Sequence, residues 1–370
     1  MRIDEIRIYR VRFPLKVPFR VSTFAIPENE AVLVNLVSES SFGWGEGTAM
    51  KLPLYSPESA ATAFVVARDF IAPLLIGQNI SSGEELQERM RVIRANCFAK
   101  AAFDHAWWDL SSRSQGIPLW QAIGGVNREV SVGQCFGVLD SIDELVSRIR
   151  DALAQGYPRI KLKYGPDWDL PVVRAVREAF PDATLHIDCN SAYSLADVDM
   201  FKALDQYGLA MIEQPLAHDD IIDHATLQDQ ISTPICLDES ITSADKTRKA
   251  IQIGACGFVN IKPPRVSGIT ASLAIQEMCE KAGIGTWIGG MLESGLGRSV
   301  CIALASLQGM DYPSDIPGTG TFYDEDITDA EVCVRQGGLV SVPLEAGCGA
   351  LPDEERLVAA TVEKAAVYHQ

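Results

Sequence analysis

Five charged residues recur along the middle of the chain at a nearly constant interval. Neighbours in this series are 25, 25, 25 and 24 residues apart, and the series is Lys163, Asp188, Glu213, Asp238 and Lys262. Each one ends a short apolar segment with the composition of a buried strand. An unpaired buried charge costs on the order of several kcal/mol, so these charges need an explanation. The constant interval predicts that they lie at the same height in successive strands and form a ring.

The three acids of this ring predict a metal site. Adjacent carboxylates repel one another and raise each other's pKa, and a hard divalent cation removes that repulsion. Mg²⁺ prefers oxygen ligands and keeps positions for water or substrate, while the absence of paired His or Cys in the ring disfavours zinc. A single such acid is more often salt-bridged or caps a helix. Three in register predict that Asp188, Glu213 and Asp238 bind Mg²⁺, or Mn²⁺ in its place.

The flanking lysines indicate acid–base chemistry beside this metal. A free lysine has a pKa of about 10.4, and a nearby cation or second ammonium lowers it toward neutrality. Lys161 and Lys163 point to the same side of a strand, so each is expected to lower the other's pKa. A metal between two amines suits abstraction of a proton next to a carboxylate, with stabilisation of the enediolate. A purely stabilising charge network and a Schiff-base lysine are the alternatives.

A second candidate feature is the glycine-rich segment 289–298, which reads Gly-Gly-Met-Leu-Glu-Ser-Gly-Leu-Gly-Arg. It follows an apolar run and precedes a helical pattern. Free backbone amides at a helix N-terminus suit an anion, so we expect a substrate carboxylate there. A tight loop without a ligand is the alternative interpretation.

The elements that position these residues follow from the apolar pattern. Residues 1–57 favour strands, with a turn or bulge at 42–47, and residues 58–126 favour helices. Beyond residue 129, apolar runs alternate with amphipathic helices, the runs being 130–138, 159–163, 184–190, 209–215, 234–239, 258–263 and 285–290. This alternation predicts an α/β fold, and a barrel rather than an open sheet because the site residues come from successive strands. We expect an eighth strand near 311–316, and a return of 320–370 to the N-terminal part.

Composition narrows the class of protein. The 370 residues include 32 Lys and Arg against 49 Asp and Glu, a formal charge of −17 that disfavours nucleic-acid and anionic-membrane partners. A hydrophobic fraction of 47% excludes disorder for most of the chain. Nine cysteines without a C-x-x-C pair, no signal segment and no membrane-spanning run favour a cytoplasmic location. We expect a small carboxylate as substrate and a homo-oligomer.

Together these motifs resemble the enolase superfamily, and within it the muconate-lactonizing-enzyme subgroup. The matching motifs are Lys161-x-Lys163, Asp188-x-Asn190, Glu213-Gln214-Pro215, Asp238-Glu239-Ser240 and Lys262-Pro263. Segments 42–46, 99–110, 262–265 and 289–298 are most similar to o-succinylbenzoate synthases and N-succinylamino-acid racemases. The resemblance implies a TIM-like (β/α)7β barrel at 127–319 and an α+β capping domain at 1–126, completed by 320–370.

The resemblance also implies residue roles. In a synthase Lys163 removes the proton alpha to the carboxylate and assists loss of hydroxide, while Lys262 stabilises the enediolate from the other face. In a racemase the two lysines exchange the roles of acid and base. Supporting roles fall to Lys161, Asn190, Glu239 and Arg265, and substrate contacts to Ser22, Tyr55, Met291, Glu293, Ser294 and Gly295. Cap loops 20–26 and 50–55 are expected to shape the substrate pocket.

The expected reaction is a Mg²⁺-dependent dehydration that forms o-succinylbenzoate for menaquinone synthesis. Racemisation of N-succinyl or other N-acyl amino acids is the main alternative. A muconate-cycloisomerase-like enzyme and a non-catalytic metal-binding barrel are lesser ones. Two departures from the family leave the substrate open, namely Ser314-Asp315 where the family has Gly-Asp, and Lys51 in a specificity loop.

Overall fold

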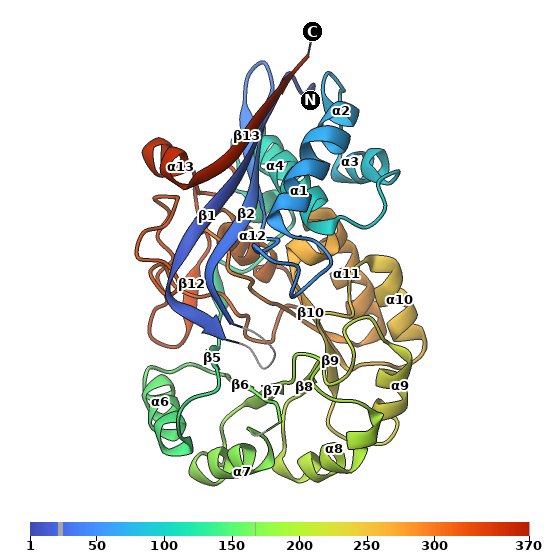
Figure 1. The fold of residues 1–370 in the computed structure, drawn as a ribbon, viewed down its shortest axis with the longest axis vertical. Coiled ribbons are helices and arrows are strands. Elements are labelled where there is room, and N and C mark those ends of the chain that lie inside the picture. Colours follow the sequence, from blue (N-terminus) through green and yellow to red (C-terminus); the bar gives the residue numbers. More distant parts are fainter. Residues whose placement is uncertain (21–24, 167, 370) are drawn as a thin grey trace.

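The computed structural model describes residues 1–20, 25–166 and 168–369. Figure 1 shows an upper part, in which an antiparallel sheet packs beside helices, and a lower part, in which helices surround a curved parallel sheet. The two chain ends lie close together at the top, because the last strand pairs with the first. The α/β architecture expected from the alternating pattern is confirmed.

The upper sheet contains strands from both ends of the chain. Its order is β13-β1-β2-β3, with bounds β1 Glu5–Arg20, β2 Ala25–Val37, β3 Phe42–Gly47 and β13 Thr361–Tyr368. Strand β13 runs antiparallel to β1, beginning with the pair Glu5 and Tyr368. The end of the tail therefore returns to the N-terminal part through β13, while the return of 320–370 as a whole and the domain boundaries at 126 and 319 stay predictions.

Strand β3 corrects the prediction of a turn at 42–47. Its three glycines, Gly43, Gly45 and Gly47, alternate along the strand against helix α4 Cys97–Gln115. A Cβ atom added to any of them would lie 2.2 Å from a backbone carbonyl oxygen of α4. The glycines therefore allow a close approach between strand and helix, which the turn interpretation missed.

Helices fill the region between β3 and the barrel, as expected for residues 58–126. Their bounds are α1 Ala60–Val66, a π-helical turn at Ala67–Ile71, α2 Ala72–Leu75, α3 Gly83–Met90, α4 Cys97–Gln115 and α5 Leu119–Ala122. Helix α4 also contacts the barrel, because buried Asp104 accepts a hydrogen bond from Thr270 Oγ1 at 2.7 Å. The two parts of the molecule are thus packed directly on each other.

The lower part contains seven parallel strands in the order β11-β10-β9-β8-β7-β6-β5. Their bounds are β5 Gln134–Phe136, β6 Ile160–Lys163, β7 Leu185–Asp188, β8 Ile212–Glu213, β9 Ile235–Leu237, β10 Phe258–Ile261 and β11 Gly285–Ile288. The intervening helices are α6 Ile142–Ala154, α7 Leu170–Ala179, α8 Val198–Leu204, α9 Ile222–Gln228, α10 Ala244–Gln252, α11 Ile269–Ala282 and α12 Gly295–Ala305. Each predicted apolar run contains one of these strands, so the βα alternation is confirmed.

The eighth strand expected near 311–316 is reduced to a single bridge. Ser314 N donates to Ser131 O at 2.9 Å, and Asp315 N donates to Ile288 O at 2.9 Å, next to β11. Ser314 and Asp315 therefore connect the segment before β5 with the end of β11. The predicted run 130–138 is also divided, since β4 Glu129–Ser131 pairs instead with β12 Leu339–Ser341.

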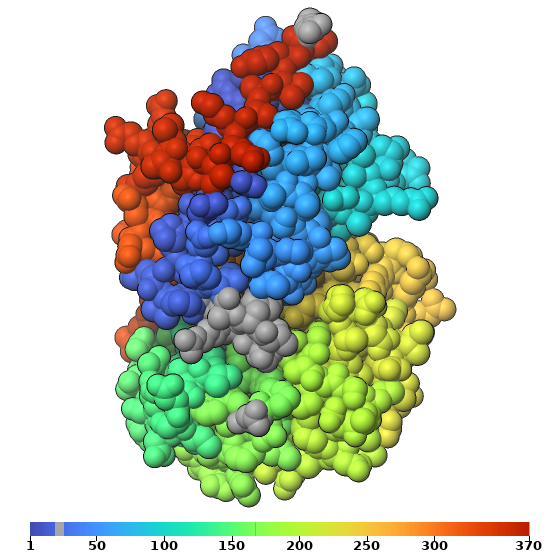
Figure 2. Space-filling view, viewed as in Figure 1, coloured from blue at the N-terminus to red at the C-terminus, as the bar shows by residue number. Residues whose placement is uncertain are grey.

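Figure 2 shows how the two parts meet, with N-terminal and C-terminal residues together covering the barrel below them. Helix α13 Glu354–Ala360 leads into β13 on the outside of this cover. None of the nine cysteines, all of which lie in the described residues, forms a disulfide. Within the described ranges, no helix is long and apolar enough to cross a membrane.

Candidate active site

The ring predicted from the residue interval forms at the carboxyl ends of the barrel strands. Lys163 is the register partner of Asp188 across β6 and β7, and Asp188 is the partner of Glu213 across β7 and β8. Asp238 and Lys262 directly follow β9 and β10. The constant interval therefore translates into neighbouring positions at one end of the barrel, where barrel active sites lie.

One side of the ring consists of two lysines on strand β6. Lys163 Nζ donates to Asp188 Oδ2 at 2.7 Å and to Asn190 Oδ1 at 2.8 Å. Lys161 Nζ lies 3.0 Å from Asp188 Oδ2 and 2.8 Å from Glu213 Oε2. Both amines are buried, so the carboxylates supply most of their hydrogen-bond partners.

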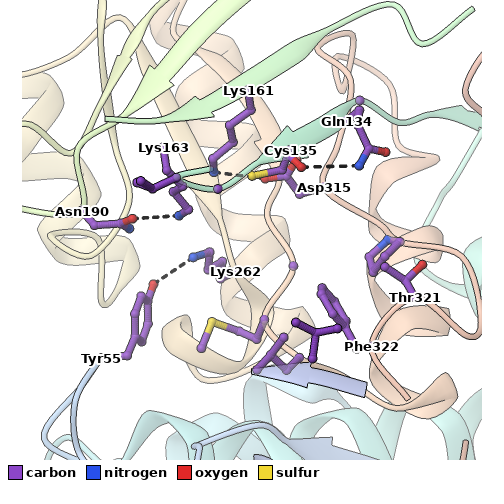
Figure 3. Close-up of a pocket in the computed structure, with 18 of the residues that line it drawn as sticks. Tyr55, Gln134, Cys135, Lys161, Lys163, Asn190, Lys262, Asp315, Thr321 and Phe322 are labelled. Carbon is purple, nitrogen blue, oxygen red and sulfur yellow. Dashed lines mark hydrogen bonds and ion pairs between the residues drawn. The ribbon is translucent and has the colours of Figure 1, made fainter. Parts of the chain in front are cut away.

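The other side of the ring is organised by Asp238. Lys262 Nζ lies 2.8 Å from Asp238 Oδ2, and the Arg265 guanidinium forms an ion pair with Asp238 Oδ1. Tyr55 reaches in from the cap, and its hydroxyl lies 3.3 Å from Lys262 Nζ and 2.8 Å from Arg265 Nη1. Figure 3 shows Lys163 and Lys262 approaching the same space from different strands, with Tyr55 below Lys262.

Lys161 lowers the pKa of Lys163, as expected, but the net pKa of Lys163 is raised in this structure. Burial lowers the pKa of Lys163 and Lys161 lowers it further, but Asp188 together with Cys135 and Glu213 raises it, and the net pKa lies above its ordinary value. The pKa of Lys262 is raised in the same way by Asp238. The acids around each amine therefore outweigh the neighbouring ammonium.

Two further acids show the opposite electrostatic effect. Burial raises the pKa of Glu213 to about 7, and the Asp188 carboxylate adds to the rise. Burial also raises the pKa of Glu239 to about 8, with Asp238 adding to it. Glu239 Oε1 accepts from Asn190 Nδ2 at 3.2 Å, while its buried Oε2 has no hydrogen-bond partner. The carboxylates of Asp188, Glu213, Asp238 and Glu239 thus oppose one another's ionisation, and a cation among them would offset this repulsion.

The residues present fit a hard divalent cation. Asp188, Glu213 and Asp238 offer only oxygen donors, and the raised pKa of Glu213 shows that the acids already act on one another. In the described part of the chain, no three His, Cys, Asp or Glu side chains form a ready cage. The reason is visible in the contacts, because Lys161 Nζ lies between the Asp188 and Glu213 carboxylates.

A cavity of about 1030 Å³ opens above the ring. Lys161, Lys163 and Lys262 line it from the barrel, Tyr55 and Met50 line it from the cap, and Met291 from the loop after β11. Of the predicted contacts, Tyr55, Met291, Asn190 and Glu239 therefore face this cavity. Arg265 lies behind Asp238, and predicted Ser22 lies outside the described residues.

The expected anion site on the glycine-rich segment is occupied by the protein itself. Glu46 of β3 accepts hydrogen bonds from Ser294 N at 3.1 Å, Ser294 Oγ at 2.5 Å and Gly297 N at 3.1 Å, while Asp326 accepts from Gly295 N at 3.0 Å. Glu293 is buried and accepts from Met291 N. Buried carboxylates of the protein therefore already accept from Ser294 and Gly295, and substrate contact by Ser294, Gly295 and Glu293 stays a prediction.

Asp315 is the site residue that sequence reasoning missed. Its Oδ2 lies 3.1 Å from Lys161 Nζ, and its Oδ1 lies 2.6 Å from the buried Arg159 guanidinium. Figure 3 shows it beside Cys135, which lines the cavity from β5. The sequence did contain a signal for Asp315, because it is an acid in the expected eighth strand. That strand also ends at the side of the barrel where the site residues lie.

Comparisons with known proteins agree with this geometry. Residues 3–124 match the mandelate racemase / muconate lactonizing enzyme N-terminal domain, and residues 144–356 match the enolase C-terminal domain-like family. The chain belongs to the enolase superfamily.

The similar proteins carry two activity names. The chain is 42% identical to an o-succinylbenzoate synthase of Geobacillus stearothermophilus, over 100% of this chain and 98% of that protein. It is also 42% identical to an N-succinylamino acid racemase of Thermus thermophilus, over 96% and 97%. A solved enolase-superfamily protein from Listeria innocua superposes with a TM-score of 0.96 at 36% identity, covering 100% of this chain and 99% of that one. The names of the Geobacillus and Thermus relatives define the two candidate reactions.

Proposed function

We propose that the protein is a Mg²⁺-dependent o-succinylbenzoate synthase. The observation that carries this proposal is the pair Lys163 and Lys262, two amines from separate strands that line one cavity beside three carboxylates. A full-length relative with the synthase name supports the particular reaction. A purely stabilising network would have no need of a cavity above its lysines.

The residues divide the work of dehydration between two sides of the cavity. Asp188, Glu213 and Asp238 would hold Mg²⁺, which supplies positive charge for the substrate carboxylate. Lys163, as the neutral amine, takes the proton on the carbon next to that carboxylate. Lys262 keeps its ammonium charge and stabilises the enediolate from the opposite side. Lys163 then gives this proton to the departing hydroxyl group of the substrate. Water leaves, and the six-membered carbon ring of the substrate becomes aromatic.

Racemisation of N-succinyl or N-acyl amino acids is the second candidate. The observation that favours it is the similar environment of the two lysines, each within 2.8 Å of an aspartate carboxylate. Either amine can then serve as acid or base. The first step is the same in both reactions, and the Thermus relative carries the racemase name.

Lysine variants test the proposal directly. Lys163→Ala is expected to abolish formation of o-succinylbenzoate, because Lys161 is held by three carboxylates and Lys262 faces the substrate from the opposite side. Lys249→Ala, which removes an exposed amine paired with Asp245 on α10, should retain wild-type turnover. Unchanged turnover in Lys163→Ala would contradict the assignment of the base.

Isotope exchange separates the two reactions. A racemase incorporates solvent deuterium at the α-carbon of both enantiomers of an N-succinyl amino acid, and each lysine variant should lose exchange with one enantiomer. Turnover of the synthase substrate, without deuterium exchange in any of a set of N-acyl amino acids, would support the synthase reaction alone. Exchange without o-succinylbenzoate formation would leave only the racemase, and absence of both would favour a non-catalytic barrel.

We also propose that the wild-type enzyme works in the cytoplasm as a homo-oligomer on a small carboxylate, and that Mn²⁺ can replace Mg²⁺. The net charge of −17 disfavours binding to nucleic acids and to anionic membranes. Light scattering coupled to size-exclusion chromatography measures the assembly, and a monomer at micromolar concentration would contradict the proposed oligomer.

A further inference from the structure

A buried histidine lies directly beneath the predicted metal ligands. His186 stands two residues before Asp188 on β7, so both side chains point to the same face of the strand. His186 is fully buried, with its ring 5.7 Å from the rings of Trp287 and Tyr312. The proposed mechanism uses none of these three aromatic side chains.

Each nitrogen of the His186 ring faces one polar group. Nδ1 lies 2.7 Å from the Tyr312 hydroxyl, which comes from the segment that bridges the first and last strands. Nε2 lies 3.4 Å from Glu213 Oε2. His186 Nε2 is buried without a hydrogen-bond partner, and Glu213 Oε2 already forms an ion pair with Lys161 at 2.8 Å. A small rotation of either side chain would let Nε2 donate to Oε2 as well.

The tautomer of the ring follows from what it faces. A carboxylate that binds a metal ion is ionised and can only accept hydrogen bonds, so Nε2 must carry the hydrogen. Nδ1 is then an acceptor, and the Tyr312 hydroxyl donates to it. The hydrogen bonds then run in one direction, from Tyr312 to His186 and from His186 to Glu213.

We propose that His186 is a positioning residue that orients the Glu213 carboxylate toward the metal, and that Tyr312 fixes the histidine tautomer for this role. The inference rests on the proposed metal-dependent function. Glu213 Oε1 accepts from Asn260 Nδ2 at 2.8 Å, so His186 and Asn260 hold the two oxygens from different strands. Hydrogen bonds behind a metal ligand restrict its orientation, and their loss typically lowers metal affinity by about 10–100-fold.

Two double variants test the role of the donor at position 186. His186→Leu with Tyr312→Phe removes donor and hydroxyl together, so no buried group of this pair is left unsatisfied. His186→Gln with Tyr312→Phe keeps an N–H at the place of Nε2. The two variants share the Tyr312 change and differ only at position 186. Circular dichroism and thermal unfolding establish that both are folded.

The measurement is the Kd for Mn²⁺, by calorimetry and by the electron paramagnetic resonance signal of free Mn²⁺. The leucine variant should bind about 10–100-fold more weakly than the wild type, while the glutamine variant keeps most of the affinity. Excess Mg²⁺ should restore turnover of the leucine variant, since the lysines are intact. Equal affinity of the leucine variant and the wild type would overturn the role of His186 alone. Absence of saturable Mn²⁺ binding in the wild type would overturn this role and the metal-dependent function together.

Discussion

Substitution of Glu46 probes the contact between cap and barrel at the edge of the cavity. The Glu46 carboxylate is 1% exposed and accepts from Ser294 N, Ser294 Oγ, Gly297 N and Thr48 Oγ1. Glutamine can keep an oxygen toward Ser294 and Gly297, and its amide would face the Thr48 hydroxyl, which can turn to accept. Glu46→Gln therefore changes three hydrogen bonds at the start of α12 from charged to neutral.

The expected loss follows from these bonds. A hydrogen bond to a charged acceptor contributes about 1.5–3 kcal/mol and a neutral one about 0.5–1.5 kcal/mol, so three bonds lose about 3 kcal/mol. Relief of the buried charge offsets part of this, because burial raises the pKa of Glu46 and so opposes its ionisation. The net loss for Glu46→Gln should be about 2 kcal/mol of unfolding free energy. Glu46→Ala should lose about 4 kcal/mol, since it leaves buried donors without a partner.

Urea unfolding of the purified variants measures these losses. The matched control is Glu277→Gln, which removes a 65% exposed carboxylate paired with Lys281 and should change the free energy of unfolding by less than about 0.5 kcal/mol. The KM of Glu46→Gln should also rise, because Met291 and Leu292 line the cavity immediately before α12. Unfolding of Glu46→Gln within about 0.5 kcal/mol of the wild type would refute the reasoning.

Three further predictions concern the fold, the pH response and the metal. Gly45→Ala should lower the free energy of unfolding in urea by about 3 kcal/mol, because its Cβ would lie 2.2 Å from Ala102 O. Gly124→Ala, where no atom lies within 4 Å of the added Cβ, should lower it by about 1 kcal/mol. Equal losses would contradict the packing argument. Burial raises the pKa of Glu293 to about 7 from 4.5, so the folded state retains a proton that the unfolded chain releases. Wild-type stability should therefore fall by about 3 kcal/mol between pH 5 and 8 relative to Glu293→Gln, and parallel pH profiles would refute this. Dialysis against EDTA should abolish turnover and Mg²⁺ should restore it, whereas activity that persists in EDTA would exclude a metal requirement.

The ring of charges could be predicted because repetition along the chain fixes position in the barrel. A constant interval between Lys163, Asp188 and Glu213 becomes direct register pairing on β6, β7 and β8. The same logic fails for the eighth strand, where only Ser314 and Asp315 bridge the neighbouring strands. Periodicity therefore predicts regular strands, and misses the short segment that closes the sheet.

Contacts between distant segments could not be predicted in this way. The amides at the start of α12 do bind an anion, as helix N-termini do, but the anion is Glu46, 248 residues earlier in the chain than Ser294. The sequence shows that an anion is favoured there and cannot show which one. The available signal was an acid within the glycine-rich strand 42–47, which is otherwise apolar.

The lysine pKa values could not be predicted because local spacing shows only near neighbours. Lys161 and Lys163 are close on one strand, which suggests mutual lowering of the pKa. The acids that reverse this come from other strands, since Asp188, Glu213 and Asp315 all lie within 3.1 Å of Lys161 Nζ. A single strand therefore gives the sign of the lysine–lysine effect and misses the net rise in pKa.

The charge balance of the site connects its stability with its choice of substrate. Three acids around the cavity have a lowered pKa and are paired with cations, the acids being Asp188, Asp238 and Asp315 and the cations Lys161, Lys163, Lys262, Arg159 and Arg265. Glu213 and Glu239, whose pKa is raised to about 7 and about 8, complete the group. A divalent cation adds two positive charges to this balance. The loaded site then attracts an anionic substrate and favours the neutral amine of Lys163, which is the form that a base requires. The same pairing that stabilises the buried charges without a ligand therefore prepares the site for a carboxylate once the cation is bound.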